Sequence, residues 1–172
     1  MKVANLIAEF LRDNGVKTVF CISGGASLHL IHGISETEGI TYVCPQTEQA
    51  AGFAADSYAR LKGFGCAIAT SGPGATNLVT AIAASYYDSI PVLYLVGNVT
   101  TKRMSGDSGV RQRGFQETPI VEIVKKITKY AAEPMISQAV IPELKMALKI
   151  AQSNRPGPVL ISIPDDIQRS EV

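Results

Sequence analysis

Short apolar runs that alternate with helical stretches are the feature that most limits what this 172-residue chain can fold into. The runs are rich in β-branched and aromatic residues, so we expect six strands, at residues 16–22, 40–44, 66–70, 91–96, 127–131 and 159–163. Strands separated by helices pair in parallel, and strands that are apolar on both faces need helices over both faces. The sequence therefore predicts an α/β fold with a doubly wound, mostly parallel six-stranded sheet and helices on both faces.

The helices between these strands are placed by their apolar spacing and their stop signals. Apolar residues recur at helical spacing from Val3 to Leu11, and Asn14-Gly15 ends that helix because glycine adopts a left-handed conformation at little cost. Residues 97–116 are polar and show no periodicity, and a loop of that length in a compact domain is usually functional or mobile. We expect the remaining helices at residues 28–34, 47–61, 74–86, 119–126 and 142–151.

Two stretches stand where a strand leads into a helix. The first runs from Gln46 to Asp56 and contains Glu48, and the second runs from Thr70 to Asn77 and contains the turn Ser71-Gly72-Pro73-Gly74. Open parallel sheets bind their ligands at the edge where the strands end. We therefore expect both stretches at the carboxyl edge of the sheet, beside any ligand.

Glu48 has two interpretations from the sequence alone. A carboxylate in the first turn of a helix is stabilised by free N–H groups and the helix dipole, so Glu48 could be a simple helix-start acid. Alternatively, Glu48 could share a proton with a ligand nitrogen. The second interpretation is favoured by the small residues around it, which offer no long side chain to solvate or pair with the carboxylate: Ala50, Ala51, Gly52, Ala54, Ala55 and Ala59.

The glycine turns are compatible with a bound phosphate but match no nucleotide motif. Ser71–Gly74 opens a helix and could cradle a phosphate on its free N–H groups. A Walker loop needs a lysine and a hydroxyl after its last glycine, whereas Gly74 is followed by Ala75-Thr76. Ser23-Gly24-Gly25 is too short for a dinucleotide fingerprint, and a tight turn without a ligand is the alternative for both segments.

Composition narrows the partners and the compartment. The formal net charge is +1 and no basic block stands out, which argues against nucleic acid as a partner. Charged residues make up 18% of the chain, so we expect part of the surface to be covered by other protein. No apolar stretch approaches the length of a membrane span and residues 1–10 lack a signal-peptide pattern, so we expect a cytoplasmic protein without a membrane partner.

Cysteines and histidines give no strong metal signal. Cys21, Cys44 and Cys66 fall in or at the end of expected strands, so we expect buried small hydrophobes rather than ligands or disulfide partners. Their common position near the carboxyl edge leaves a metal or redox site as the alternative. His29 and His32 lie one helical turn apart without a third ligand in the same segment, which predicts partly exposed helix positions rather than a zinc site. We predict no metal site in this chain.

Several long motifs together resemble one known family. They are residues 47–60, residues 71–77, Asp88-Ser89-Ile90-Pro91-Val92, Gly114-Phe115-Gln116-Glu117-Thr118 and residues 155–161, and in this order they cover essentially the whole chain. The chain resembles the N-terminal pyrimidine-binding domain of thiamine-diphosphate-dependent enzymes, most closely the acetolactate synthase large-subunit group. Glu48 argues against the carboligase branch that lacks it, and the loop has no His-His pair of the pyruvate decarboxylase kind.

The resemblance implies a cofactor, a reaction and a set of site residues. The cofactor would be thiamine diphosphate, with Glu48 bonding its pyrimidine nitrogen and favouring the imino tautomer, which takes the proton from the thiazolium carbon. The complete enzyme would decarboxylate a 2-oxo acid and transfer the two-carbon unit. Residues matched to the pyrimidine end are Ser23, Gly24, Glu48, Gly74 and Asn77. Residues matched to the substrate side are Phe115 and Gln116, with Gln116 the second catalytic candidate beside Glu48.

The resemblance also predicts domains and partners. Residues 1–164 match the pyrimidine-binding domain, and residues 165–172 match the start of a linker to an absent middle domain. Magnesium and the diphosphate would be held by another domain, whose Gly-Asp-Gly…Asn signature is not in this sequence. We therefore expect a homodimer or pairing with a diphosphate-binding domain, and no activity from this domain alone. FAD binding is left open, because the family's flavin site lies mostly in the middle domain.

Two departures from the family pattern and three alternatives accompany this interpretation. Thr47 stands where the family usually has histidine, and Ser23-Gly24-Gly25 stands where many relatives have a proline-glycine pair. The first puts the orientation of the neighbouring carboxylate in question. The alternatives are one subunit of a split thiamine-diphosphate decarboxylase, a non-catalytic binding or assembly module of the same fold, and a nucleotide binder that uses residues 71–77.

Overall fold

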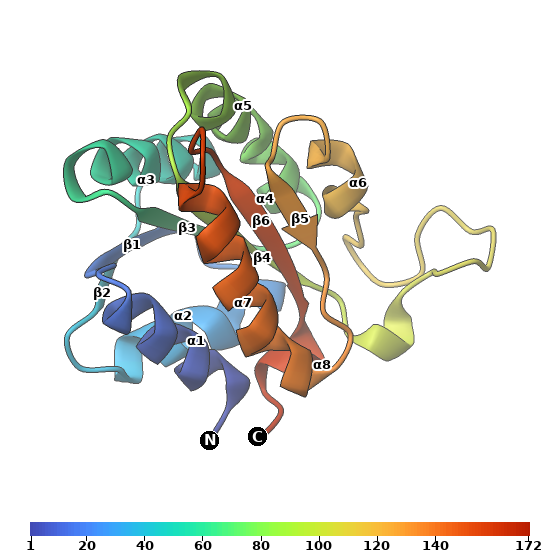
Figure 1. The fold of residues 1–172 in the computed structure, drawn as a ribbon. Coiled ribbons are helices and arrows are strands. Elements are labelled where there is room, and N and C mark those ends of the chain that lie inside the picture. The colour runs from blue at the N-terminus through green and yellow to red at the C-terminus, as the bar shows by residue number, and fades with distance from the viewer.

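The computed structural model describes residues 1–172 as one twisted sheet between two layers of helices (Figure 1). All six strands are parallel, in the order β2-β1-β3-β4-β6-β5. The predicted doubly wound α/β fold is confirmed, and each expected strand is present with its bounds shifted by no more than a few residues. The strands are β1 Thr18–Cys21, β2 Thr41–Val43, β3 Gly65–Ala69, β4 Val92–Asn98, β5 Tyr130–Ala132 and β6 Val159–Pro164.

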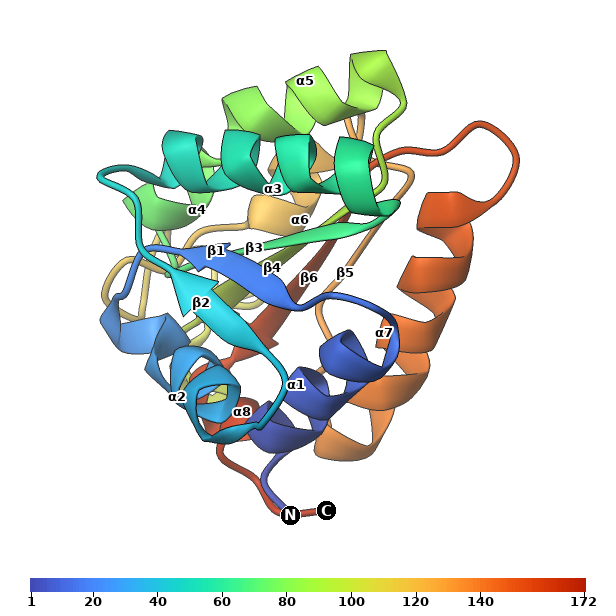
Figure 2. The same ribbon diagram turned by 90° about the vertical axis from the view of Figure 1, so that its left-hand side faces the viewer.

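The helices divide between the two faces of the sheet (Figure 2). One face carries α1 Val3–Asp13, α2 Leu28–Glu36, α7 Ser137–Gln152 and the short α8 Asp165–Gln168; the other carries α3 Glu48–Lys62, α4 Pro73–Asn77, α5 Val79–Asp88 and α6 Ile120–Val124. No helix is both long enough and apolar enough to cross a bilayer. The helices of both layers pack their apolar sides against the sheet, as the strand pattern predicted.

Two separate apolar clusters fill the space between the sheet and its helices. The cluster under α1, α2 and α7 contains 24 buried residues, and the cluster under α3 to α6 contains 14. The second is rich in alanine because α3 packs closely on α5: a Cβ on Gly52 would stand 2.4 Å from the Cβ of Ala81. The small residues that surround Glu48 in the sequence thus serve close helix packing.

Burial varies strongly across the sheet. Every residue of β3, β4 and β6 is buried, whereas all three residues of β2 are exposed. The expectation that each strand is covered on both faces is wrong for β2, because β2 lies at the edge of the sheet and packs mainly against β1 and α2. Cys44, which follows β2, is exposed for the same reason and not buried as expected, while Cys21 and Cys66 are buried.

The helix expected over residues 74–86 is also corrected, because the structure divides it into α4 and α5. The interruption lies at Leu78, whose N–H bonds the carbonyl oxygen of Ala75, three residues back, at 3.1 Å. This tighter turn places the Leu78 side chain fully in the core. The short α4 is thereby set apart as the segment that carries Gly74 and Asn77.

The C-terminal residues pack against the domain. Ile167 and Gln168 of α8 are buried, and Lys2 forms an antiparallel bridge with Glu171. The chain ends therefore lie side by side (Figures 1 and 2). Residues 165–172 continue the folded body in this structure, and a middle domain beyond them stays a prediction.

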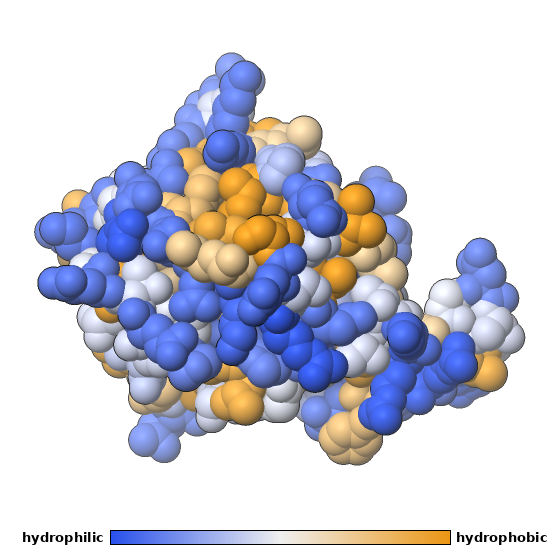
Figure 3. Space-filling view, turned by 90° about the horizontal axis from the view of Figure 1, so that it is seen from below, coloured by the Kyte–Doolittle hydropathy of each residue, from blue (hydrophilic) through white to orange (hydrophobic).

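The chain between β4 and α6 forms a long loop that begins with a short 3-10 turn, η2 Thr101–Arg103. In the view from below, this loop projects from the body at the right and its surface is mainly hydrophilic (Figure 3). The aperiodic, polar character of residues 97–116 thus predicted a loop correctly.

Candidate functional site

Glu48 is the first residue of α3 and faces the beginning of α4. Thr47 caps the helix by accepting a hydrogen bond from the N–H of Ala50 at 3.2 Å. Glu48 Oε2 accepts a hydrogen bond from Asn77 Nδ2 at 3.1 Å, and Oε1 lies 3.5 Å from the point where a Cβ on Gly74 would stand. No ion pair includes Glu48, which is half-buried. Its Oε1 therefore keeps free acceptor capacity next to the glycine turn.

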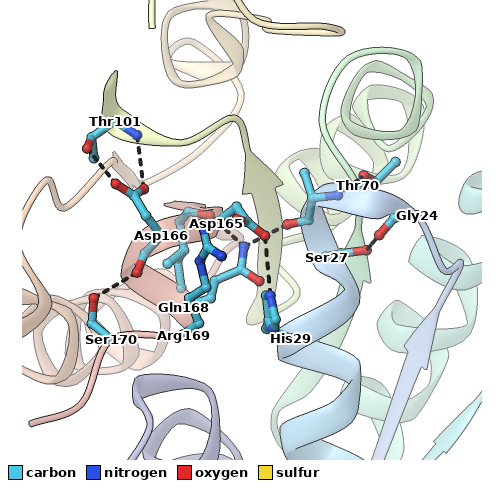
Figure 4. Close-up of polar contacts among 12 residues, drawn as sticks. Gly24, Ser27, His29, Thr70, Thr101, Asp165, Asp166, Gln168, Arg169 and Ser170 are labelled. Carbon is cyan, nitrogen blue, oxygen red and sulfur yellow. Dashed lines mark hydrogen bonds and ion pairs between the residues drawn. The ribbon is translucent and has the colours of Figure 1, made fainter. Parts of the chain in front are cut away.

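Thr70, directly after β3, joins the two turns at the carboxyl edge (Figure 4). Its Oγ1 accepts a hydrogen bond from the N–H of Ala26 at 3.2 Å. A Cβ on Gly24 would stand 2.5 Å from Thr70 Cβ, and a Cβ on Gly74 would stand 2.7 Å from Thr70 Cγ2. Both glycines are thus required by close approach to Thr70, and the two predicted turns lie against each other through this one side chain.

Gln116 lies against the second turn. A Cβ on Gly72 would stand 2.7 Å from Gln116 Cβ and 2.9 Å from its carbonyl oxygen, so only glycine admits this contact. Gln116 itself has a φ of +61°, an uncommon conformation for a residue with a side chain. The neighbouring Phe115 is 82% exposed and lines a hollow of about 180 Å³ together with Ala26 and Arg103. The loop thus brings Gln116 into the site and leaves the Phe115 ring at its rim.

Glu117 holds both ends of the loop that carries this pair. Oε1 accepts hydrogen bonds from the N–H and the hydroxyl of Ser105, at 2.6 and 2.8 Å. Oε2 accepts hydrogen bonds from the N–H groups of Arg113 and Gly114, at 2.9 and 3.3 Å. Desolvation acts to raise the pKa of Glu117, but the hydrogen bonds from Ser105, Arg113 and Gly114 outweigh it and lower that pKa. The ionised carboxylate therefore closes the loop next to Phe115 and Gln116.

The first turn is supported from the opposite side by α8 (Figure 4). Nε2 of the fully buried Gln168 donates hydrogen bonds to the carbonyl oxygens of Ala26 and Ile163, at 2.6 and 2.7 Å. Gly97 of β4 allows the turn to approach the sheet, since a Cβ there would stand 1.8 Å from the Ala26 carbonyl oxygen. The position of the first turn is therefore set by contacts with Thr70, Gly97 and Gln168, which are distant from it in the sequence.

Asp166 of α8 fixes the start of the long loop between β4 and α6. Asp166 accepts hydrogen bonds from the N–H and the hydroxyl of Thr101, at 2.9 and 2.6 Å (Figure 4). Desolvation acts to raise the pKa of Asp166, but these hydrogen bonds and those from nearby backbone N–H groups outweigh it and lower the pKa. The next acid toward the sheet, Asp165, lies 3.5 Å from Nε2 of the partly exposed His29. Both contacts join α8 to the elements that surround the first turn.

The predicted site residues are thus brought together unevenly. Those that meet at the carboxyl edge are Gly24, Glu48, Gly74, Asn77 and Gln116. Ser23 is exposed and its side chain makes no hydrogen bond within the chain, and Phe115 stays at the rim. The roles of all these residues stay predictions. Sequence reasoning assigned no role to Thr70, Glu117 or Gln168. Thr70 opens the stretch expected beside a ligand and Glu117 stands in the quoted motif, whereas Gln168 carried no signal.

Comparison with known proteins gives the family. Residues 1–123 match the family model described as thiamine pyrophosphate enzyme, N-terminal TPP binding domain. The chain belongs to this family. It is similar to the chloroplastic acetolactate synthase 2 of Nicotiana tabacum, with 41% identity over 172 residues and 99% of this chain covered. It is also similar to the chloroplastic acetolactate synthases of Arabidopsis thaliana (41% identity, 98% of this chain) and, for synthase 1, Zea mays (40% identity, 98% of this chain).

This member of the thiamine pyrophosphate enzyme family spans about a quarter of the length of those relatives. The matched share is 25% of the Nicotiana protein, 24% of the Arabidopsis protein and 26% of the Zea protein. The predicted resemblance to the N-terminal, pyrimidine-binding part of an acetolactate synthase is therefore confirmed. The activity, substrates and partners of the whole relatives do not transfer to this chain by identity alone.

The residues at the carboxyl edge fit the aminopyrimidine part of this family's cofactor. Such a ring is flat, its amino group donates hydrogen bonds, and its ring nitrogens accept them or take up a proton, so a carboxyl group at its edge suits it. Glu48 Oε1 is an acceptor without a partner in the chain, and Gly74, which packs against Thr70, lies next to that oxygen. No group of three or more His, Cys, Asp or Glu side chains is placed to hold a metal ion.

Proposed function

We propose that this chain holds the aminopyrimidine end of thiamine diphosphate in an enzyme of the acetolactate synthase type. The observation that carries the proposal is the placement of Glu48. Its carboxylate has no ion pair, is oriented by Asn77 and lies next to Gly74, in a chain whose family binds this cofactor. A simple helix-start acid needs none of these neighbours, so the proton-sharing interpretation is the better supported of the two.

Each residue of the site has a distinct role in this proposal. Glu48 Oε1 holds the proton at a pyrimidine ring nitrogen, while Asn77 fixes Oε2 and thereby the plane of the carboxylate. Gly24 and Gly74 let both turns pack against Thr70, which keeps the turns together beside Glu48. Thr47 supplies a helix cap where the family usually has histidine, and this cap leaves the proton role of Glu48 intact.

The bound cofactor supplies the carbon nucleophile that decarboxylates a 2-oxo acid and carries the two-carbon unit to an acceptor. In this reaction Gln116 offers its amide to the bound substrate from the loop side of the site. Phe115 presents an apolar ring at the rim, where it excludes water from one side of the substrate. Both roles depend on the contact between the Gln116 backbone and Gly72.

The chain forms only one wall of the site, so the proposal includes assembly. A homodimer, or pairing with a diphosphate-binding domain, would cover the half-buried Glu48, and that domain would hold magnesium and the diphosphate. We expect the chain by itself to have no decarboxylase or carboligase activity. The flavin question stays open, and the cytoplasmic location stays a prediction; the names of the plant relatives place those proteins in chloroplasts.

The test is Glu48→Gln in the enzyme assembled with its diphosphate-binding domain. The amide keeps the size of the side chain but cannot take up the proton, so we expect pyruvate turnover to fall by about 10²- to 10⁴-fold. The matched control is Glu38→Gln, which neutralises an exposed acid outside the site and should leave turnover unchanged. Thermal unfolding of both variants should match that of the unaltered protein.

Two results would contradict the proposal. Unchanged cofactor-dependent turnover in the Glu48→Gln enzyme would remove the proton role and favour a non-catalytic assembly module of the same fold. Turnover of pyruvate by this chain alone, with thiamine diphosphate and magnesium, would show that the site does not need a second wall.

A further inference from the structure

Two free cysteines lie next to each other at the edge of the sheet. Cys21 is the last residue of β1, and Cys44 directly follows β2. The two strands pair in parallel with Phe20 opposite Val43, so the next residue of each strand is a direct neighbour (Figure 2). The two sulfur atoms lie 3.7 Å apart.

The two thiols differ in their access to solvent. Cys44 is exposed, whereas Cys21 is fully buried. Burial, together with the hydrogen bond and charge of Cys44, raises the pKa of Cys21 to about 12. A dissolved reagent can therefore reach Cys44 first, and only then can the neighbouring Cys21 react with the product.

We propose that Cys21 and Cys44 are a covalent modification site at which a low-molecular-weight disulfide, such as glutathione disulfide, closes an intramolecular disulfide bond. The Cys44 thiolate attacks one sulfur of the reagent, forms a mixed disulfide and releases one glutathione thiolate. Cys21 then attacks the Cys44 sulfur, loses its proton to water and releases the second glutathione. In total, two protein thiols are oxidised to one disulfide, and one glutathione disulfide is reduced to two glutathione molecules.

The geometry allows this bond without rearrangement of the sheet. Neighbouring strands lie about 4.8 Å apart, which is within the roughly 4.4–6.8 Å between Cα atoms that disulfides span. The sulfur atoms have to approach from 3.7 Å to about 2.05 Å. Rotation of the exposed Cys44 side chain, which lies outside β2, can supply most of this movement.

Cys66 provides a third thiol that should not take part. It lies inside β3, is fully buried, and its only hydrogen bond goes to the carbonyl oxygen of Ala67. Burial raises its pKa far above the ordinary value for a thiol. No reagent in solution reaches it in the folded chain, so it serves as an internal control.

The disulfide bond would lie at the ends of β1 and β2, just before the chain continues into the first turn and into α3. Ser23 and Gly24 follow Cys21 after one residue, and Glu48 is the fourth residue after Cys44. Oxidation would therefore tie the strand that precedes the first turn to the strand that precedes α3. The modification itself depends only on the thiols and does not rest on the proposed function.

The experiment exposes the folded 172-residue chain to glutathione disulfide, then alkylates the remaining thiols and maps the products by mass spectrometry. We expect a peptide cross-linked through Cys21 and Cys44, no retained glutathione and alkylation of Cys66 alone after denaturation. Cys66→Ser should give the same cross-link. Cys21→Ser should accumulate one glutathione on Cys44, and Cys44→Ser should react with none.

Three outcomes would overturn the proposal. These are no oxidation of the folded chain, a glutathione that stays on Cys44 without closure, and cross-links that include Cys66 or join two chains. Oxidation of the chain in denaturant is the control for the effect of folding, since the unfolded chain should give a mixture of all cysteine pairings. The same mixture from the folded chain would show that the structure does not select the pair.

Discussion

Replacing Glu117 by alanine should release the loop that carries Phe115 and Gln116. The carboxylate accepts four hydrogen bonds, two from Ser105 near the start of the loop and two from backbone N–H groups at residues 113 and 114. No other side chain joins these two ends of the loop by hydrogen bonds. The exposed tip between them, residues 106–112, should therefore lose its main constraint.

The size of the effect follows from the number of bonds. A hydrogen bond contributes about 0.5–1.5 kcal/mol net to stability. We take the lower half of that range because Glu117 is half-buried, so water can bond to the same N–H and hydroxyl groups when the carboxylate is removed. Four bonds then contribute about 2–4 kcal/mol to loop closure. At about 1.36 kcal/mol for each factor of ten, the open population of the loop should rise roughly 30- to 900-fold.

Amide hydrogen exchange measures this opening directly, because three of the four donors are the N–H groups of Ser105, Arg113 and Gly114. We expect these amides to lose their protection in Glu117→Ala, while amides of the central strands keep theirs. Glu117→Gln, which retains one acceptor oxygen, should lie between. The matched control is Asp107→Asn, which removes an exposed carboxylate from the same loop without removing a hydrogen bond.

The lowered pKa of Glu117 gives the same prediction a pH dependence. The folded-state pKa is below the unfolded value of about 4.3. The stabilisation by the Glu117 hydrogen bonds is therefore fully present above the unfolded pKa and is lost as pH falls through the folded-state pKa. Corrected for intrinsic exchange, protection should be constant above about pH 5 and should decrease under more acidic conditions. Equal protection in Glu117→Ala and the unaltered chain at neutral pH would refute the reasoning.

Two further substitutions test the supports of the site. Gly97→Ala places a Cβ 1.8 Å from the carbonyl oxygen of Ala26, so the first turn must shift. We expect the free energy of unfolding, measured by chemical denaturation, to fall by about 1–3 kcal/mol. The control Gly25→Ala should cause no loss, because nothing lies within 4 Å of its Cβ position. Tyr94→Phe removes a buried hydroxyl that lies 2.9 Å from the Ser85 hydroxyl, while Ser85 keeps its bond to Asp56; we expect a loss of about 1 kcal/mol in the same assay, and an equal stability to the unaltered chain would contradict it.

The sheet and the position of the site could be predicted because both follow from local signals. Apolar runs between helical stretches determine a parallel sheet, and a parallel sheet places every strand-to-helix turn at one edge. Glu48, Gly74 and Asn77 follow such turns, so their sequence positions already place them at that edge. The direct bond between Glu48 and Asn77 follows from this geometry rather than from either segment alone.

The supports of the site could not be predicted because they are contacts between distant segments. Thr70 bonds Ala26, 44 residues away, and Gln168 bonds the same Ala26 residue across 142 residues. Neither residue type has a pattern that names its partner. The exposure of Cys44 was missed for a related reason: strand order decides which strand is at the edge, and strand order cannot be read from the apolar runs.

The open side of Glu48 argues that the fold is built for a site completed by a second surface. Asn77 binds one carboxylate oxygen, and the other oxygen faces the glycine turn with no partner from the chain. In the separate chain water reaches this half-buried oxygen and competes with any ring nitrogen for it. A surface that excludes this water would strengthen the hydrogen bond, because charge-assisted bonds gain strength where the local dielectric is low. Affinity for the pyrimidine should therefore rise on assembly with no change in the residues that contact it, and this rise should disappear in Glu48→Gln.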